Sequence, residues 1–188
     1  MSWTIEAVNE ENFDLWLDYF DNRALKDNDE WDGCYCQAYL FTAEEEQEID
    51  NSGVAYQKVY REKACDRIKT KSMQGYIAIE DNKVIGWLAA GPANNYPKFP
   101  KTDLLTARAV CFVIDPGRRG EGIASDLLQF GISDLRARGF KVLEARGVPE
   151  GKTIAANYPG PISLYRKFGF TAAQTFDDGY TLMKKELS

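Results

Sequence analysis

The segment Ile114-Asp115-Pro116-Gly117-Arg118-Arg119-Gly120-Glu121-Gly122-Ile123-Ala124 joins an apolar run to the most regular amphipathic stretch of the chain. The run over residues 107–114 predicts a strand buried on both faces, and residues 121–138 predict a helix with one apolar stripe. No side chain of Gly120-Glu121-Gly122 can cap that helix, so its first N–H groups are left for another acceptor. The helix dipole, the arginines and the close backbone approach that glycine permits favour a phosphate or pyrophosphate at this turn.

The alternative is a tight turn that needs glycine and happens to carry arginines. For a Gly-x-Gly sequence without other support, this is the commoner interpretation. The segment is not a P-loop, because Lys-Ser/Thr does not follow it. It is not the dinucleotide-binding fingerprint either, because the third glycine is missing. The phosphate hypothesis therefore depends on support from the rest of the chain.

The composition excludes several classes of function. The chain has 188 residues, so we expect one domain over residues 1–188. Acidic residues outnumber basic ones by 29 to 23, which argues against a nucleic-acid partner. Histidine is absent, which removes histidine-based catalysis and most catalytic zinc sites. No run approaches the ~20 apolar residues of a membrane span, and the N-terminus lacks a signal-peptide pattern, so we expect a cytoplasmic protein with free thiols, no metal and no membrane partner.

The remaining periodicity predicts an α/β fold, a mixed central sheet with helices on both faces. Residues 4–8 predict a strand, and Asn9 is expected to cap a helix through Phe13 and Phe20. A polar helix is expected to begin at Thr42, which forms a capping box with Glu45, and to break at Asn51-Ser52-Gly53. The other expected elements are a hairpin over 75–79 and 84–90, a strand over 141–145, a short helix over 162–168 and a last hairpin over 170–175 and 180–184.

Two motifs in this order resemble those of the GCN5-related N-acetyltransferase (GNAT) superfamily. Arg119-x-x-Gly122-x-Ala124 resembles the family's Arg/Gln-x-x-Gly-x-Gly/Ala signature. Ser163-Leu164-Tyr165-Arg166-Lys167-Phe168-Gly169-Phe170 resembles its Leu-Tyr-x-x-x-Gly-Phe end. The resemblance covers about residues 75–185 and implies the GNAT fold, a mixed sheet of about seven strands that splays at the cofactor strand.

The resemblance also implies acetyl-CoA as the cosubstrate. The family's cofactor strand pairs its backbone with the pantetheine, which here corresponds to Phe112, Val113 and Ile114. The amides that would hold the pyrophosphate are those of Arg119, Gly120, Glu121, Gly122, Ile123 and Ala124. Asn157 is a further candidate, since it stands beside Tyr158, which occupies the place of a family asparagine.

Tyr165 lies where the family places its general acid. The resemblance implies that its hydroxyl protonates the CoA thiolate as an amine takes the acetyl group. A phenol with a pKa near ~10 can donate a proton to a departing thiolate. From its pattern alone, a tyrosine on a short amphipathic helix is a packing residue.

An alkyl amine is mostly protonated at neutral pH, so the reaction also needs a base. Glu144 is the candidate, because Leu143-Glu144-Ala145-Arg146 resembles the Leu-Glu-Val-Arg of the ribosomal-protein N-terminal acetyltransferases, whose glutamate faces the cleft. A salt bridge to Arg146 and a surface position are the alternatives for Glu144. Tyr158 or a chain of waters would then have to take the proton.

Several features bear on the acceptor. The link from Glu144 to Tyr165 is longer than in that subgroup, which argues against protein N-termini as substrates. Nine acids within residues 10–32 predict either an acidic rim that attracts a cationic amine or a solvated face. Cys34 and Cys36 are too close for an ordinary disulfide and could bind a metal only with distant partners.

The hypothesis for the whole chain is acetyl-CoA-dependent transfer to the primary amine of a small molecule or peptide, by direct attack. A longer CoA ester as acyl donor is one alternative. A CoA-binding sensor or interaction module without acceptor turnover is the other. A homodimer is left open.

Overall fold

The computed structural model describes residues 2–150 and 157–187. Its centre is a seven-stranded sheet in the order β1-β2-β3-β4-β5-β7-β6. β4 and β5 run parallel and the other neighbours are antiparallel, so the sheet is mixed, as predicted. The strands are β1 (Thr4–Ala7), β2 (Gly75–Glu80), β3 (Lys83–Pro92), β4 (Thr106–Ile114), β5 (Val142–Gly147), β6 (Thr171–Thr175) and β7 (Thr181–Glu186).

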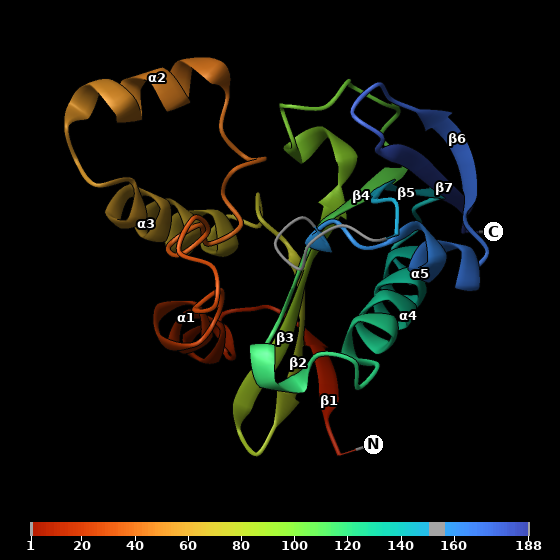
Figure 1. The fold of residues 1–188 in the computed structure, drawn as a ribbon, viewed down its shortest axis with the longest axis horizontal. Helices are drawn as coiled ribbons and strands as arrows, with labels where there is room; N and C mark the ends of the chain where they lie inside the picture. The colour runs from red at the N-terminus through yellow and green to blue at the C-terminus, as the bar shows by residue number, and fades with distance from the viewer. Residues whose placement is uncertain (1, 151–156, 188) are drawn as a thin grey trace.

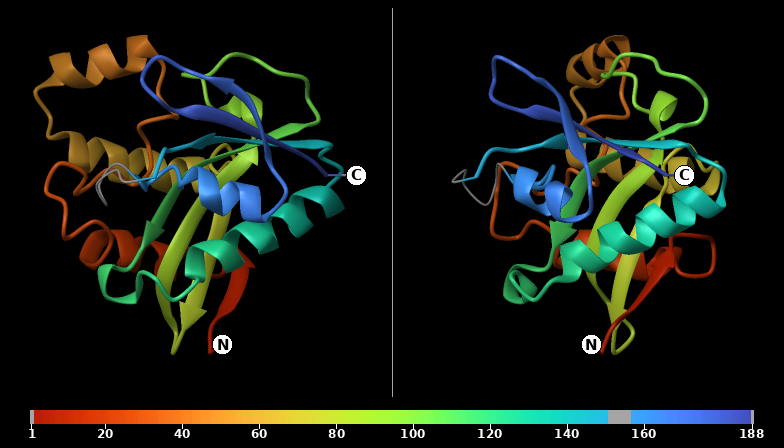
Figure 2. Two further views of the ribbon diagram at one scale, coloured as in Figure 1. Left: turned by 45° about the vertical axis from the view of Figure 1, so that its right-hand side comes forward. Right: turned by 90° about the vertical axis from the view of Figure 1, so that its right-hand side faces the viewer.

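Helices lie on both faces of this sheet (Figures 1 and 2). One side carries α1 (Phe13–Asn22), α2 (Ala43–Ser52) and α3 (Tyr56–Lys69), and the other carries α4 (Ile123–Ala137) and α5 (Ile162–Lys167). Successive strand residues point to opposite faces, so each face has its own core. On β3, Trp87 belongs to the cluster of Trp16, while its neighbour Leu88 belongs to the cluster of Leu127.

Local sequence signals fix several boundaries. The Thr42 hydroxyl accepts the Glu45 N–H at 3.2 Å and the Glu45 carboxylate accepts the Thr42 N–H at 2.9 Å, which is the predicted capping box. Gly53 follows α2 with φ +67°, which confirms the predicted break. The turn between β2 and β3 has positive φ at both Asp81 and Asn82, as the type I′ turn of a two-residue hairpin loop requires.

The start of the first helix differs from the prediction. α1 begins at Phe13, after Asn12, and Asn9 does not cap it. The Asn9 side chain instead accepts the N–H groups of Glu11 and Asn12, at 2.7 and 3.3 Å. Asn9 therefore stabilises the turn that leads into the helix, because its side chain bonds the backbone two or three residues ahead.

β4 and β5 separate partway along, as the expected splay requires. Their pairing covers only Thr106–Ala109 of β4, although β4 continues to Ile114. On the other edge of β4, Ala89 pairs with Cys111 and Ala90 with Ala109, which leaves Val110 as an extra residue. A bulge bends its strand, so the extra residue turns β4 away from β5 where their pairing ends.

Candidate functional site

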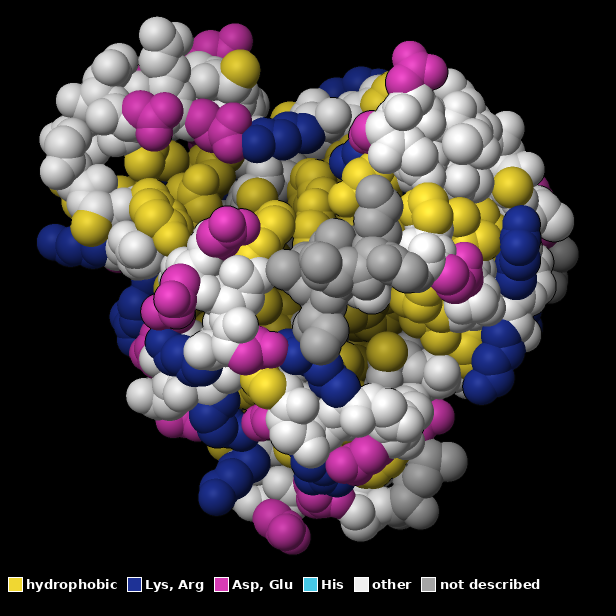
Figure 3. Space-filling view, in the orientation of Figure 1, with side chains coloured by type: hydrophobic (Ala, Val, Ile, Leu, Met, Phe, Trp, Pro, Cys, Tyr) yellow, Lys and Arg dark blue, Asp and Glu magenta, His cyan; other side chains and the backbone are white. Residues whose placement is uncertain are grey.

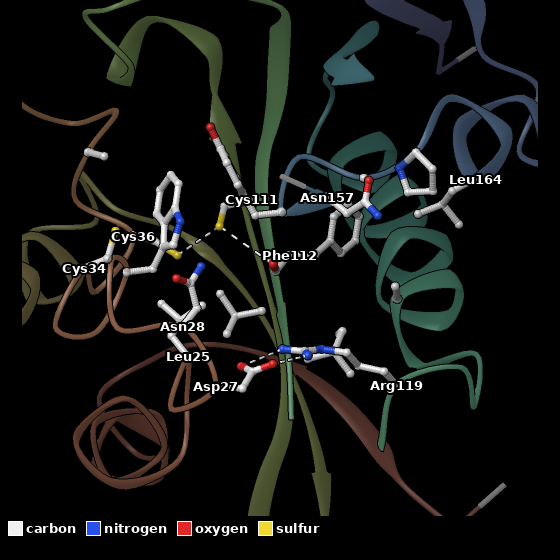
Figure 4. A pocket seen from close by; sticks show the side chains of 18 of the residues that line it. Leu25, Asp27, Asn28, Cys34, Cys36, Cys111, Phe112, Arg119, Asn157 and Leu164 are labelled. Atoms are coloured by element: carbon white, nitrogen blue, oxygen red, sulfur yellow. Dashed lines mark hydrogen bonds and ion pairs between the residues drawn. The ribbon is translucent and has the colours of Figure 1, made fainter. Parts of the chain in front are cut away.

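A cavity of about 490 Å³ lies beside the unpaired end of β4. The loop after α1 forms one wall, β4 forms the floor, and α4, α5 and the segment before α5 form the other wall (Figure 4). Figure 3 shows hydrophobic side chains gathered in the hollowed centre of this face. The lining residues are Leu25, Asp27, Asn28, Trp31, Cys34, Cys36, Ala38, Tyr39, Cys111, Phe112, Val113, Ile114, Arg119, Ala124, Asn157, Tyr158, Gly160, Pro161 and Leu164.

The predicted cofactor residues divide between the cavity and its edge. Those that line it are Phe112, Val113, Ile114, Arg119, Ala124 and Asn157. Those outside the lining are Gly120, Glu121, Gly122 and Ile123. Of these four, Ile123 is buried under the sheet, whereas the other three are exposed. The structure thus brings the strand and the arginine together and leaves the glycine turn at the cavity's edge.

The turn before α4 has the uncapped geometry that the sequence predicts. Gly122 precedes the helix with φ +96°, and no side chain caps the helix there. Gly120 has φ +84°, and a Cβ on either glycine would meet nothing within 4 Å. Glycine is therefore required for the backbone conformation, and the space beside it is open. Arg118 is held by carboxylates, since its Nε donates to Glu121 at 2.9 Å and its guanidinium also contacts Glu80.

Arg119 reaches across the cavity to Asp27 on the opposite wall (Figure 4). One of its N–H groups donates to Asp27 Oδ1 at 3.1 Å. This hydrogen bond lowers the pKa of Asp27, so the carboxylate stays ionised. The sequence did not single out Asp27, because nothing in its local pattern separates it from the neighbouring acids.

The segment before α5 fills the gap between the separated strands. The Phe112 N–H on β4 donates to the carbonyl of Tyr158 at 2.6 Å, and the Val148 N–H after β5 donates to the carbonyl of Gly160 at 2.9 Å. Residues 157–160 therefore satisfy backbone groups that a neighbouring strand would otherwise take. The sequence showed the longer connection but not its location.

The side chain of Tyr158 forms an aromatic wall with Trp31 and Tyr39. Its ring centroid lies 4.7 Å from that of Trp31, and its hydroxyl lies 2.6 Å from the Tyr39 hydroxyl. Burial and the neighbouring Tyr39 raise the pKa of Tyr158, so this hydroxyl is protonated at neutral pH. These three residues come from parts of the chain whose proximity the sequence could not reveal.

Tyr165 is fully buried on α5, just behind the cavity wall. Its hydroxyl donates to the Pro159 carbonyl, and its ring packs against Phe170 at a centroid distance of 5.2 Å. A Cβ on Gly160, which lines the cavity, would lie 3.0 Å from this hydroxyl. Burial raises the pKa of Tyr165, so its proton is retained at neutral pH. Gly160 thus lies between the Tyr165 hydroxyl and the cavity.

Comparison with known proteins identifies the family. The sequence model of the acetyltransferase (GNAT) family matches residues 39–170, more than half of the chain. This chain belongs to the acetyltransferase (GNAT) family. As a GNAT protein it is an acyltransferase, and the resemblance drawn from its two motifs is confirmed. A comparison with curated proteins finds no match.

Solved GNAT structures share the fold of this chain at low sequence identity. An N-acetyltransferase from Staphylococcus aureus Mu50 is 19% identical, with a TM-score of 0.59 and coverage of 100% of both chains. The ribosomal-protein-S18-alanine N-acetyltransferase from Escherichia coli is 18% identical, with a TM-score of 0.53 and coverage of 99% of this chain and 94% of that one. YncA from Salmonella typhimurium, solved with its cofactor acetyl-CoA, is 17% identical, with a TM-score of 0.57 and coverage of 100% and 95%. These likenesses confirm the predicted fold class.

Glu144 lies within an ion triad in which Glu144 and Arg108 are buried and Lys184 is partly exposed. Glu144 is 3% exposed, and its two carboxylate oxygens bind Arg108 at 2.6 Å and Lys184 at 2.8 Å. Burial opposes its ionisation, but the hydrogen bonds from Lys184 and Arg108 outweigh burial and lower its pKa. Glu144 is not among the residues that line the cavity. The salt bridge to Arg146 is not formed, because Arg146 pairs with Asp178.

These contacts favour a structural role for Glu144 in this GNAT protein, and they predict a stability defect. Glu144→Gln leaves Arg108 buried without its counter-ion, so we expect a loss of about 3 kcal/mol in the free energy of unfolding at pH 7. The pKa of Glu144 is lower in the folded state than in the unfolded chain. Its charged form therefore stabilises the fold above the unfolded pKa, near ~4.3, and this contribution disappears as the pH falls through the folded pKa.

Urea unfolding of Glu144→Gln and the parent at pH 7 and pH 4 measures this effect. The difference between the two proteins should shrink at pH 4. Asp178→Asn, which breaks an exposed bridge, is the matched control and should cost less than about 1 kcal/mol. A fully stable Glu144→Gln protein whose kcat/KM is low at pH 7 and recovers at high pH would support the base hypothesis instead.

Four of the nine acids of residues 10–32 have basic partners, and one of the four is Asp27, paired with Arg119. Asp27 lines the cavity, and the other ion pairs from this region are Asp18 with Arg23, Asp21 with Arg61 and Asp32 with Lys26. Within residues 2–150 and 157–187, no group of three or more acidic or cysteine side chains is placed to hold a metal ion. In the same part of the chain, no helix is long and apolar enough to cross a membrane.

Proposed function

We propose that this GNAT protein transfers an acetyl group from acetyl-CoA to a primary amine that enters the cavity between the loop after α1 and α5. The observation that carries the proposal is the convergence of three features at one cavity. These are the unpaired end of β4, the uncapped start of α4 and the aromatic wall. The thioester supplies the activated acyl group, and the protein's part is to bind, orient and move protons.

The cofactor end of the cavity suits a pyrophosphate. The first amides of α4 have no side-chain cap, and the helix dipole favours an anion there. In this proposal Arg119 exchanges Asp27 for a phosphate oxygen, which leaves the Asp27 carboxylate free on the wall opposite Arg119. An ionised carboxylate on that wall would attract a cationic amine.

The strand end of the cavity would hold the pantetheine. Pairing at Phe112 requires the Tyr158 carbonyl to move aside, because that carbonyl now accepts the Phe112 N–H. Ile114 also lines the cavity and is the second backbone position in the proposal. The segment of residues 157–160 would shift as the pantetheine takes its place beside β4.

Tyr165 is the proposed general acid. Its raised pKa keeps the proton on the oxygen, and its hydroxyl must exchange the Pro159 carbonyl for the departing thiolate sulfur. The hydroxyl of Tyr158, a residue that lines the cavity, is bonded to Tyr39 and is the second candidate for this role. The amine must lose a proton before or during attack, and a chain of waters in the cavity would carry that proton away, because Glu144 is held by Arg108 and Lys184.

Release of free CoA thiol on adding amines tests the proposal. The unmodified protein is incubated with acetyl-CoA and a panel of aliphatic, aromatic and peptidic primary amines, and thiol is followed with time. We expect thiol release that depends on both the protein and the amine. Binding of acetyl-CoA without release for any amine would favour the CoA-binding sensor, and faster release with longer CoA esters would change the acyl donor.

A further inference from the structure

Two thiols from distant parts of the chain meet in the wall of the cavity. Cys36 lies in the loop that follows α1, and Cys111 lies on β4. Their sulfur atoms are 3.3 Å apart, with Cys36 donating a hydrogen bond to Cys111 (Figure 4). Both cysteines are free thiols, both are more than nine-tenths buried, and both line the cavity.

The loop is held in an unfavourable backbone conformation that presents Cys36 to β4. Tyr35 has φ +45° and Cys36 has φ +52°, a region that side chains other than glycine rarely adopt. Each such residue costs free energy and persists only where its surroundings enforce it, and such residues cluster at functional sites. Two consecutive residues in this region therefore need strong local support.

Polar contacts around the loop supply that support. The Tyr35 hydroxyl donates to Asp21 at 2.6 Å, and Asp21 also binds the Arg61 guanidinium at 2.8 Å. The fully buried Gln37 side chain donates to the Tyr35 carbonyl at 3.0 Å and accepts from Arg67 at 2.7 Å. The position of the Cys36 thiol is thus fixed by a network anchored in α1 and α3.

We propose that Cys36 and Cys111 form an oxidation site at which a peroxide converts the two thiols into an intramolecular disulfide across the cavity wall. One sulfur attacks the O–O bond, which gives a sulfenic acid and one water molecule. The second sulfur then attacks the sulfenic sulfur, the S–S bond forms and a second water molecule leaves. The two sulfur atoms lose two electrons to the peroxide, and both thiol protons end in water.

The geometry separates this pair from the other two cysteines. Cys34 also lines the cavity, and burial raises the pKa of both the Cys34 and the Cys36 thiols; what sets Cys36 apart is the Cys111 sulfur, 3.3 Å from its own. Cys65 lies on α3 and is not among the residues that line the cavity. The cavity admits a molecule as small as hydrogen peroxide to Cys36 and Cys111. The product would fasten the loop that carries Trp31 to the floor of the cavity.

Peptide mapping of the full chain after brief hydrogen peroxide treatment tests the proposal. Remaining thiols are alkylated, and the protein is digested without reduction. We expect a peptide pair linked through Cys36 and Cys111, loss of two of the four thiols, and an intact mass lower by about 2 Da, the two hydrogen atoms removed. Dithiothreitol should restore both thiols. Recovery of Cys36 and Cys111 as alkylated thiols while Cys65 is oxidised would overturn the proposal, and so would a disulfide that contains Cys34.

Matched variants sharpen the result. Cys34→Ser and Cys65→Ser keep the pair and should still form the link, whereas Cys111→Ser should abolish it. Since mapping on the unmodified chain already decides the outcome, an unstable Cys111→Ser protein would not weaken the test. The readout needs no acetyl-CoA and no amine, so its failure would leave the proposed acyl transfer untouched.

Discussion

Gly122→Glu is expected to weaken acetyl-CoA binding by roughly 100-fold or more, because a carboxylate beside the uncapped start of α4 repels the pyrophosphate and competes for the same amides. The substitution also places a side chain at φ +96°, which costs about 1–2 kcal/mol of stability. Calorimetric titration with acetyl-CoA measures the affinity, and thermal melting shows that the variant is folded.

Gly139→Glu is the matched control for this variant. Gly139 follows the other end of α4, has φ +92°, and a Cβ there would meet nothing within 4 Å, so the strain and the added charge are the same. Its affinity for acetyl-CoA should be close to that of the parent. If the two variants lose affinity equally, or neither loses it, the pyrophosphate does not bind at this turn.

Tyr165→Phe is expected to lower kcat by roughly 10²–10⁴-fold, the usual contribution of a positioned general acid. The ring still packs against Phe170, so the affinity for acetyl-CoA should change little. The lost hydroxyl leaves the Pro159 carbonyl without this donor, which should cost about 1–3 kcal/mol of stability. Steady-state thiol release with any amine active in the thiol assay gives kcat, and single-turnover kinetics shows whether the chemical step is the one that slows.

Two variants control for the loss of a buried hydroxyl. Tyr76→Phe removes a hydroxyl that donates to Asp134 at 2.8 Å, away from the cavity, and should retain the parent's kcat. Tyr158→Phe removes the hydroxyl of a residue that lines the cavity. If Tyr158→Phe loses turnover while Tyr165→Phe keeps it, the proton comes from Tyr158, and Tyr165 is a packing residue.

The sequence predicted the elements of this fold well because each carries a local signal. Examples are the capping box at Thr42, the apolar stripe of α4 and the turn at Asp81-Asn82. In each case the residues that specify the structure lie within a few positions of it. The splay was expected only from the family resemblance. In the structure the splay goes with Val110, the extra residue in β4. Which residue is extra depends on how β4 pairs with β3, and no local sequence pattern encodes that pairing.

The side-chain partners at the site could not be predicted for the same reason. Glu144 meets Arg108 on β4 and Lys184 on β7 because the three residues lie side by side in the sheet register. Arg146, which is closer in sequence, is two residues along the strand and pairs with Asp178 instead. Likewise, Asp27 meets Arg119 only because the loop after α1 folds back over the end of β4.

Amide hydrogen–deuterium exchange of the unmodified protein, with and without acetyl-CoA, tests the central claim most directly. We expect acetyl-CoA to slow exchange at residues 119–124, whose amides are proposed to hold the pyrophosphate, and at Ile114. At residues 157–160 exchange should change as the segment leaves the gap beside β4. Protection confined to other parts of the chain, or no protection at saturating acetyl-CoA, would contradict the assignment of this cavity as the acetyl-CoA site.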